Sequence, residues 1–285
     1  MAKTIGNPIS WAARSLGATG NHVTESVSRI GSSEAEKLPR VQTLTLQDLH
    51  ACLRAGYADF LETRTDAVFI VLVYPIAGIL LFGIAMNLDL VPLLAPLVAG
   101  FALIGPVAAV GLYEISRKRE LSDEVHWLDA VGVFRSPSFG AILALGFYLV
   151  MLLLIWLMVA QSIYVQTIGP EPPASFSAFA KQVFTTGAGW MMIVSGTAAG
   201  FLFALCALAV SVVSFPLLLD RKVGLPVAVV TSVRVLRHNP RVILTWGFIV
   251  AALLVIGAIP MLLGLIVVMP VLGHATWHLY RRAIK

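Results

Sequence analysis

The sequence predicts an all-α polytopic membrane protein, with six transmembrane helices arranged as three hairpins and an amphipathic interfacial helix before each hairpin. Composition is the first indication, because 58% of the 285 residues are hydrophobic and only 12% are charged, against roughly 25% charged in ordinary soluble domains. The second is that the apolar residues form long runs without Asp, Glu, Lys or Arg, and a helix needs about 20 such residues to cross the bilayer core. The third is the placement of basic residues between these runs.

The first 43 residues are polar and rich in Ser, Gly and Thr. They contain no run of about 7–15 apolar residues, which a secretory signal needs, and three glutamates argue against an organelle transit peptide. We therefore expect a disordered cytoplasmic tail over 1–43 and a membrane domain over 44–285. The three units of the membrane domain are expected at about 44–119, 120–222 and 223–285.

Six spans account for the charge-free runs and their flanks. The C-terminal run from Val242 to Trp277 would be about 54 Å long as one helix at 1.5 Å per residue, and the GAIP segment near its middle suits a tight turn. Basic residues flank both ends of this run, and cytoplasmic flanks collect Lys and Arg, so the run crosses twice. The spans are expected near Ala67–Met86, Val91–Tyr113, Phe139–Ile163, Gly189–Pro216, Val242–Gly257 and Met261–Trp277.

Positive charge places both chain ends in the cytoplasm. With six spans, only Lys181 of the twenty basic residues falls on the outer side, as the positive-inside rule requires. The net charge of +5 therefore reflects topology and attraction to the anionic inner leaflet. It gives no argument for a nucleic-acid partner.

An amphipathic stretch precedes each hairpin. In the first, Leu46, Leu49 and Leu53 recur at three- and four-residue steps, and Thr45 with Asp48 resembles a capping box. The second and third read EVHWLDAVGVFRSPS and LPVAVVTSVRVLRHNPR. Their arginines predict a basic cytoplasmic surface that binds anionic lipid headgroups, with docking of a membrane-protein partner as the alternative. This surface consists of Arg54, Arg64, Arg135, Arg234 and Arg237.

The ends of the first and third units align without a gap as GPVAAVGLYEISR and MPVLGHATWHLYR, which indicates an internal threefold repeat. Taken in order, LRAGYADF, GPVAAVGLYEISR, SFPLLLDR and LGHATWHLYR resemble the bacterial predicted integral membrane proteins known as domain of unknown function 2189. The resemblance covers about Leu44 to Arg282. It implies a location in the bacterial inner membrane and supports six spans, and it brings no activity and no catalytic residues.

His274 and His278 stand one helical turn apart before two arginines, and imidazoles at this spacing can hold a divalent metal. Ala275 stands where the metalloprotease pattern needs a glutamate, which excludes that hydrolase class. Further ligands would come from Glu114 or Asp220, at the same cytoplasmic depth. The alternative is a polar membrane edge, where the histidines hydrogen-bond to headgroups or neighbouring helices. We favour this alternative and expect no cofactor.

The spans carry no ionisable residue at mid-depth, which argues against ion-coupled transport but leaves a passive route for a lipid-like solute. In the fourth span, GTAAG places Gly196 and Gly200 one turn apart, where small residues let helices approach closely. We expect this face to pack inside the bundle, with dimerisation as the alternative. Because no nucleophile–base set is visible, the sequence predicts a non-enzymatic scaffold or assembly factor. A transporter of a passive or lipid-like solute is the alternative, and a cytoplasmic-face metal site is a third hypothesis.

Overall fold

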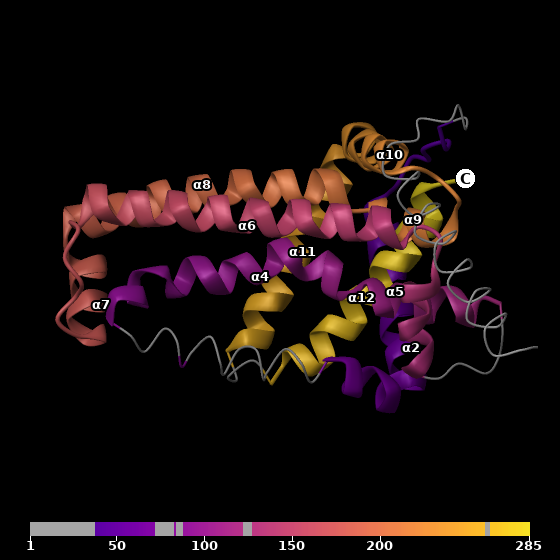
Figure 1. Cartoon of the computed structure of the whole chain (residues 1–285), viewed down its shortest axis with the longest axis horizontal. Helices are drawn as coiled ribbons and strands as arrows, with labels where there is room; N and C mark the ends of the chain where they lie inside the picture. The colour runs from indigo at the N-terminus through magenta and orange to yellow at the C-terminus, as the bar shows by residue number, and fades with distance from the viewer. Residues whose placement is uncertain (1–37, 72–82, 84–87, 122–126, 260–262) are drawn as a thin grey trace, which may run out of the picture.

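The computed structural model describes residues 38–71, 83, 88–121, 127–259 and 263–285. Within these ranges the regular elements are all helices, with one isolated antiparallel bridge between Val41 and Ile284, so the predicted all-α class is confirmed there (Figure 1). The elements are α2 (Leu46–Val71), η1 (Leu88–Leu93), α4 (Leu94–Ala108), α5 (Val110–Arg119), η2 (Trp127–Arg135), α6 (Phe139–Thr167), α7 (Phe176–Thr185), α8 (Gly187–Ser211), α9 (Ser214–Asp220), α10 (Leu225–His238), α11 (Pro240–Ala258) and α12 (Leu265–Ala283).

Three helical segments in the described ranges are long and apolar enough to cross a membrane. They are α6, the stretch Gly187–Asp220 that joins α8 to α9, and α11. A fourth crossing results if the bent pair Leu90–Gly100 and Ala102–Ala108 forms one span. These segments match the second to fifth predicted spans. The predicted first span, Ala67–Met86, lies mostly outside the described residues, and α12, over the predicted sixth, does not meet the same criterion.

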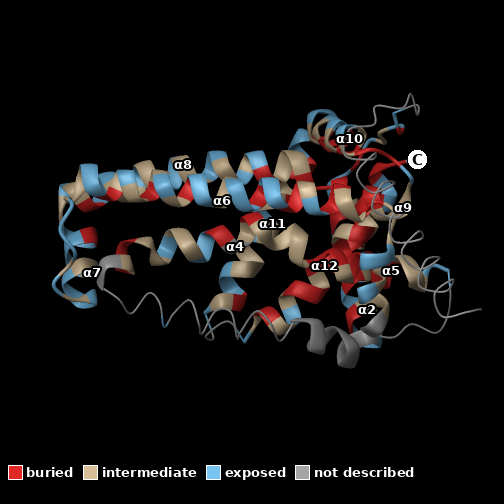
Figure 2. Cartoon of the chain, in the orientation of Figure 1, coloured by how far each residue is buried: buried red, intermediate tan, exposed pale blue. Residues whose placement is uncertain are grey.

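The spanning helices expose apolar surface, as lipid-facing helices do. Only 28% of the most apolar window of α6 and 22% of that of α11 are buried within the protein, and Figure 2 shows exposed residues along much of α6 and α8. Large side chains such as Phe147 and Met158 are among the exposed residues. An apolar surface of this extent suits hydrocarbon rather than water.

One of the spans is bent, and another is interrupted by a short turn. The α4 span bends by 47° between Gly100 and Ala102, one turn before Pro106, which has no N–H to donate to the Ala102 carbonyl. The second break separates α8 from α9, where the backbone N–H of Val213 donates to the Ser232 hydroxyl at 3.5 Å. Because Ser232 belongs to α10, this break docks the end of α8 onto a neighbouring helix.

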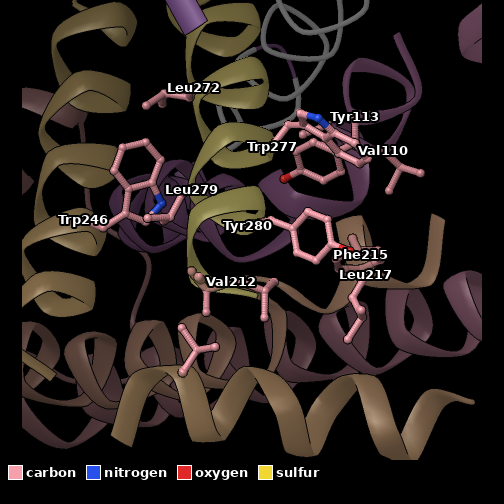
Figure 3. Packing of buried hydrophobic residues seen from close by; sticks show 14 of the residues in the cluster. Val110, Tyr113, Val212, Phe215, Leu217, Trp246, Leu272, Trp277, Leu279 and Tyr280 are labelled. Carbon is pink, nitrogen blue, oxygen red and sulfur yellow. The ribbon is translucent and has the colours of Figure 1, made fainter. Parts of the chain in front are cut away.

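The densest packing lies at one end of the bundle, which we call the charged end. It comprises α2 from Leu46 to Glu62, residues 110–120, residues 214–221 and the second half of α12, residues 272–283; α7 lies at the opposite end (Figure 1). Buried residues concentrate there (Figure 2). Figure 3 shows Trp277 and Tyr280 on α12, with Phe215 and Leu217 of α9 on one side and Trp246 of α11 on the other.

The last residues of the predicted tail are ordered. The backbone N–H of Gln42 donates to the Ala283 carbonyl at 2.9 Å, and the Asn239 side chain accepts a hydrogen bond from the Leu44 N–H at 2.8 Å. Residues 40–43 therefore lie beside the C-terminus and the start of α11. Their backbone finds partners nearly 200 or more positions away, which no local sequence pattern reveals. The rest of the predicted tail lies outside the described residues.

Candidate functional site

Helices α2 and α12 come closest at Gly56. A Cβ placed on Gly56 would lie 2.5 Å from the amide nitrogen of Ala275 and 2.7 Å from the carbonyl oxygen of Val271. Both atoms belong to the backbone, so any larger residue at Gly56 forces the two helices apart. Gly56 in LRAGYADF and Ala275 in LGHATWHLYR thus face each other in one helix–helix contact. Because the backbones approach this closely, polar side chains one turn further along each helix can meet.

Asp59, one turn after Gly56, joins three helices. Its carboxylate lies 2.8 Å from Nε2 of His278 on α12 and 2.9 Å from a guanidinium nitrogen of Arg119, the last residue of α5. Arg119 also pairs with Glu62 on α2. Burial raises the pKa of the Asp59 carboxyl, but the hydrogen bond to His278 and the nearby positive charges outweigh it, and the pKa lies below its ordinary value. The ionised carboxylate therefore fastens α2 to both α12 and α5.

His274 points to a different helix from His278. It is fully buried, and its Nδ1 lies 2.6 Å from the hydroxyl of the buried Ser116 on α5. Its Nε2 has no hydrogen-bond partner among the described residues. The two histidines thus diverge, one towards α5 and the other towards α2. Both histidines make hydrogen bonds to neighbouring helices, as expected for the polar membrane edge that was the alternative to a metal site.

The third predicted metal ligand, Glu114, is held by its own helix. Its carboxylate accepts two hydrogen bonds from the Arg117 guanidinium, at 2.7 and 2.8 Å, and this pairing offsets burial and raises the pKa of Arg117. Within the part of the chain that the structure describes, no group of three or more His, Cys, Asp and Glu side chains could hold a metal ion. The hypothesis of a metal site at His274, His278 and Glu114 therefore has no ligand geometry there.

The end of α12 is tied to α5 and α9 by a second set of contacts. The Trp277 indole donates to the Glu120 carboxylate at 2.9 Å, and the Tyr280 hydroxyl donates to the Asp220 carboxylate at 2.6 Å. Arg281 pairs with both carboxylates, at 3.1 and 3.3 Å. Burial and the Asp220 carboxylate raise the pKa of Tyr280, so the phenol stays a donor. The carboxylate of Asp220, which the sequence suggested as a further metal ligand, is therefore already engaged in a hydrogen bond and an ion pair.

The acidic side chains described at the charged end and on η2 all have a basic partner, whereas several arginines do not. The acidic residues concerned are Asp48, Asp59, Glu62, Glu114, Glu120, Asp129 and Asp220. Of the predicted basic surface, Arg54, Arg135, Arg234 and Arg237 are exposed and have no ion pair among the described residues. The side chain of Arg64 lies outside the described part of the chain. Charge is therefore segregated into ion pairs, some of which have an exposed member such as Glu62 or Arg282, and free, exposed arginines.

The two glycines of the fourth span have different surroundings. A Cβ on Gly200 would lie 3.2 Å from the Trp156 ring of α6, whereas a Cβ on Gly196 would meet nothing within 4 Å. Trp156 also donates its indole N–H to the Pro96 carbonyl at 2.9 Å and packs against Phe203 at 5.6 Å between ring centroids. Gly200 thus gives room to the side chain that joins α4, α6 and α8, and Gly196 borders open space.

An apolar cavity of about 340 Å³ lies between α4, α8, α11 and α12. Its lining includes Leu103, Leu208, Trp246 and Leu254, and no Asp, Glu, Lys, Arg or His belongs to the described lining. The hydroxyls of Ser211 and Thr276, two of its few polar groups, donate to carbonyls of their own helices at 2.6 and 2.7 Å. The hypothesis of a lipid-like solute requires a hollow of this kind.

Sequence reasoning missed Gly56, Asp59, Ser116 and Arg119 as parts of the site. The only available signal is a shared spacing, since Gly56 precedes Asp59 by the same three positions that separate Ala275 from His278. A small residue followed one turn later by a polar one is typical of closely packed helices that also bond through side chains. It does not reveal which helices pair.

The comparisons with known proteins agree with this picture. The family model described as "Predicted integral membrane protein (DUF2189)" matches residues 93–220, which run from the start of α4 to the end of α9. No curated protein and no solved structure matches the chain. The matched segment contains the motif GPVAAVGLYEISR, so the resemblance drawn from the motifs is confirmed over this part of the chain. Residues 93–220 are thus similar to the DUF2189 family of predicted integral membrane proteins.

Proposed function

We propose that this protein is a non-enzymatic scaffold or assembly factor of the bacterial inner membrane, with the charged end and both termini in the cytoplasm. The observation that carries the proposal is the segregation of charge described above. Ion pairs between α2, α5, α9 and α12 hold the helices at fixed positions, and the exposed arginines around them remain available. A rigid support with an unpaired basic face suits contact with an acidic surface.

The proposed topology has six spans in three hairpins, with Ala67–Met86 and Met261–Trp277 as the first and sixth. Two features support it. Among the described residues, the opposite end of the bundle, at α7, carries Lys181 as its basic residue, and the other basic residues gather towards the charged end. A reporter enzyme fused after Lys285 should be active only in the cytoplasm. Activity restricted to the periplasm would show that the number of crossings is odd.

The basic face is proposed to bind anionic headgroups of the inner leaflet and to present an acidic partner protein to the membrane. Purification from native membranes in mild detergent should yield a stoichiometric partner. Because Arg234 and Arg237 are exposed on α10, reversing both charges should release the partner and lower the amount of co-purifying phosphatidylglycerol without altering the melting temperature. The control is Lys181→Glu at the opposite end, which should retain both. Repeated isolation of the bare chain from the unaltered protein would contradict the scaffold function.

One observation favours a second candidate function, passive transport of a lipid-like solute. The apolar cavity between the spans offers a place for such a solute, and its described lining holds no charge that would favour an ion. Transport also requires passage to both faces of the membrane. Reconstituted proteoliposomes should then move a fluorescent lipid between leaflets faster than protein-free liposomes, and equal rates would exclude this candidate.

A further inference from the structure

We infer that the cavity between α4, α8, α11 and α12 binds one acyl chain of a bilayer phospholipid. The inference does not depend on the scaffold function. Transport of a lipid-like solute presupposes such binding, but binding does not presuppose transport. The argument uses the position of the cavity, the chemistry of its lining and its size.

The cavity opens onto the lipid-facing surface. Phe201 on α8 and Phe248 on α11 belong to its lining, yet they are 60% and 74% exposed. Both helices belong to segments that are apolar enough to span the membrane. These two side chains therefore mark a mouth between α8 and α11 at the depth of the hydrocarbon, where acyl chains are the solvent.

The lining offers few partners to water or a headgroup, because its described polar side chains are those of Tyr113, Ser211, Trp246 and Thr276. A buried water needs two to four polar partners, but the Ser211 and Thr276 hydroxyls already donate to backbone carbonyls of their own helices. A carboxylate or phosphate would lose its hydration without gaining a charged or histidine partner from the described lining. The occupant must therefore be a hydrocarbon chain whose polar end stays outside the mouth. A phospholipid in the adjacent leaflet meets this condition, because its headgroup remains at the interface.

The volume fits a single chain. A dry apolar cavity of about 150 Å³ is enough to bind benzene, and small-molecule sites begin at about 300 Å³. At about 340 Å³ the cavity takes much of one acyl chain and has no room for a second chain with its headgroup. This size predicts one equivalent of lipid per protein.

Trp246 provides a direct reporter, because it lines the cavity and is buried. Full-length protein, depleted of lipid in detergent, is titrated with a phosphatidylcholine that carries a dibrominated acyl chain, and tryptophan fluorescence is followed. The quenching that depends on Trp246 is the difference between the unaltered protein and Trp246→Phe. It should saturate near one equivalent. Quenching that only rises in proportion to the brominated lipid would indicate bulk contact and overturn the inference.

Two glycines give a matched pair of variants. A Cβ would meet nothing within 4 Å at either Gly105 on α4 or Gly196 on α8, but only Gly105 lines the cavity. Gly105→Leu should weaken the saturable quenching at least tenfold, while Gly196→Leu should bind like the unaltered protein. If Gly105→Leu does not fold, Ala204→Phe narrows the same cavity from α8 and should have the same effect. Equal binding by all variants would overturn the inference.

Free dibromostearic acid separates the two sources of an acyl chain. Saturable quenching by the free acid but not by the phospholipid would overturn the phospholipid assignment. Absence of saturable quenching with both probes would overturn the site altogether. Loss of a scaffold partner would leave every one of these titrations unchanged.

Discussion

Replacement of Gly56 by alanine tests the central contact of the charged end. The added methyl group would lie 2.5 Å from the Ala275 nitrogen and 2.7 Å from the Val271 carbonyl oxygen, well inside van der Waals distance. Neither atom can rotate away, because both belong to the backbone of α12. The helices must separate, and the 2.8 Å contact between Asp59 and His278 lengthens with them.

The magnitude follows from three contributions. Overpacking a tight contact costs about 1–3 kcal/mol, and loss of a hydrogen bond to a charged group costs about 1.5–3 kcal/mol. Removing a glycine from a helix interior returns about 0.5–1 kcal/mol. The net loss in the free energy of unfolding is therefore about 2–5 kcal/mol.

Thermal unfolding of the detergent-solubilised protein measures this loss. Gly196→Ala is the matched control, since it gains the same helix propensity where nothing lies within 4 Å, and its melting temperature should equal or exceed that of the unaltered protein. Gly56→Ala should melt clearly below both. A melting temperature for Gly56→Ala that equals the control's would refute the close approach of α2 and α12.

A double variant tests whether Gly56 acts through the hydrogen bond. If Gly56→Ala already breaks the contact of His278, then adding His278→Ala should cost less than the two single effects summed, by about 0.5–3 kcal/mol. Additive effects would mean that the packing at Gly56 and the hydrogen bond of His278 are independent. Gly56→Ala would then not act by breaking that hydrogen bond.

Three further predictions concern single groups. Asp59 has a lowered pKa, so its contribution to stability is present above the ordinary carboxyl pKa of about 3.9 and is lost as the pH falls through the lower pKa of the folded state. The difference in melting temperature between the unaltered protein and Asp59→Asn should therefore be present at pH 7 and shrink below pH ~4. A difference that does not depend on pH would count against the ionised carboxylate. Cys52 is fully buried, and burial raises the pKa of its thiol to about 11. N-ethylmaleimide should therefore modify Cys52 only after the protein is unfolded in SDS, which mass spectrometry can measure. Rapid modification of the folded protein would contradict this burial. Asn239→Ala leaves the buried Leu44 N–H without its acceptor, which lowers the free energy of unfolding by about 1–3 kcal/mol. A protease should then cut near residues 38–44 sooner than in the unaltered protein. Unchanged cleavage would mean that other contacts hold this segment.

The parts of the fold that the sequence predicts are those set by local pattern. Length and hydropathy locate the second to fifth spans within a few residues of the observed helices. The capping box is present, since the Thr45 N–H donates to the Asp48 carboxylate at 2.8 Å and the Asp48 N–H donates to the Thr45 hydroxyl at 3.3 Å. The third amphipathic stretch is the helix α10, although its buried residues are Ala228, Thr231, Ser232 and Val235 rather than the expected Val229, Val233 and Leu236. Each of these features depends on residues a few positions apart.

The parts that escape prediction depend on contacts between distant segments. Asp59 and His278 lie 219 positions apart, and nothing local to either residue indicates that α2 reaches α12. The second amphipathic stretch shows a milder failure, because its described part, η2, is a 3-10 helix rather than an α-helix. It ends at Arg135, directly before Ser-Pro, where proline removes a backbone donor and favours extended backbone in the preceding residue.

The alignment of the first and third units illustrates the same division. It pairs Tyr113 with Trp277, and both side chains are buried at the charged end, as similar positions in a repeat would be. It also pairs Glu114 with His278, yet these two bond differently: Glu114 bonds within α5, and His278 bonds across to α2. A repeat in sequence therefore preserves which positions face inward. The chemistry at those positions depends on the neighbour that each unit meets.

Helix α12 is shared by the charged end and the apolar cavity, and this arrangement links the two sites physically. Thr276 lines the cavity, while its neighbours in sequence, Ala275 and Trp277, pack on Gly56 and bond to Glu120. One helix therefore presents one face to the cavity and the opposite faces to α2 and α5. Because a helix moves as a rigid element and closely packed interfaces deform little, a ligand that alters the position of α12 must alter the contacts of α2 as well. Arg54, the exposed arginine described on α2, is thus mechanically coupled to the apolar cavity through a single helix.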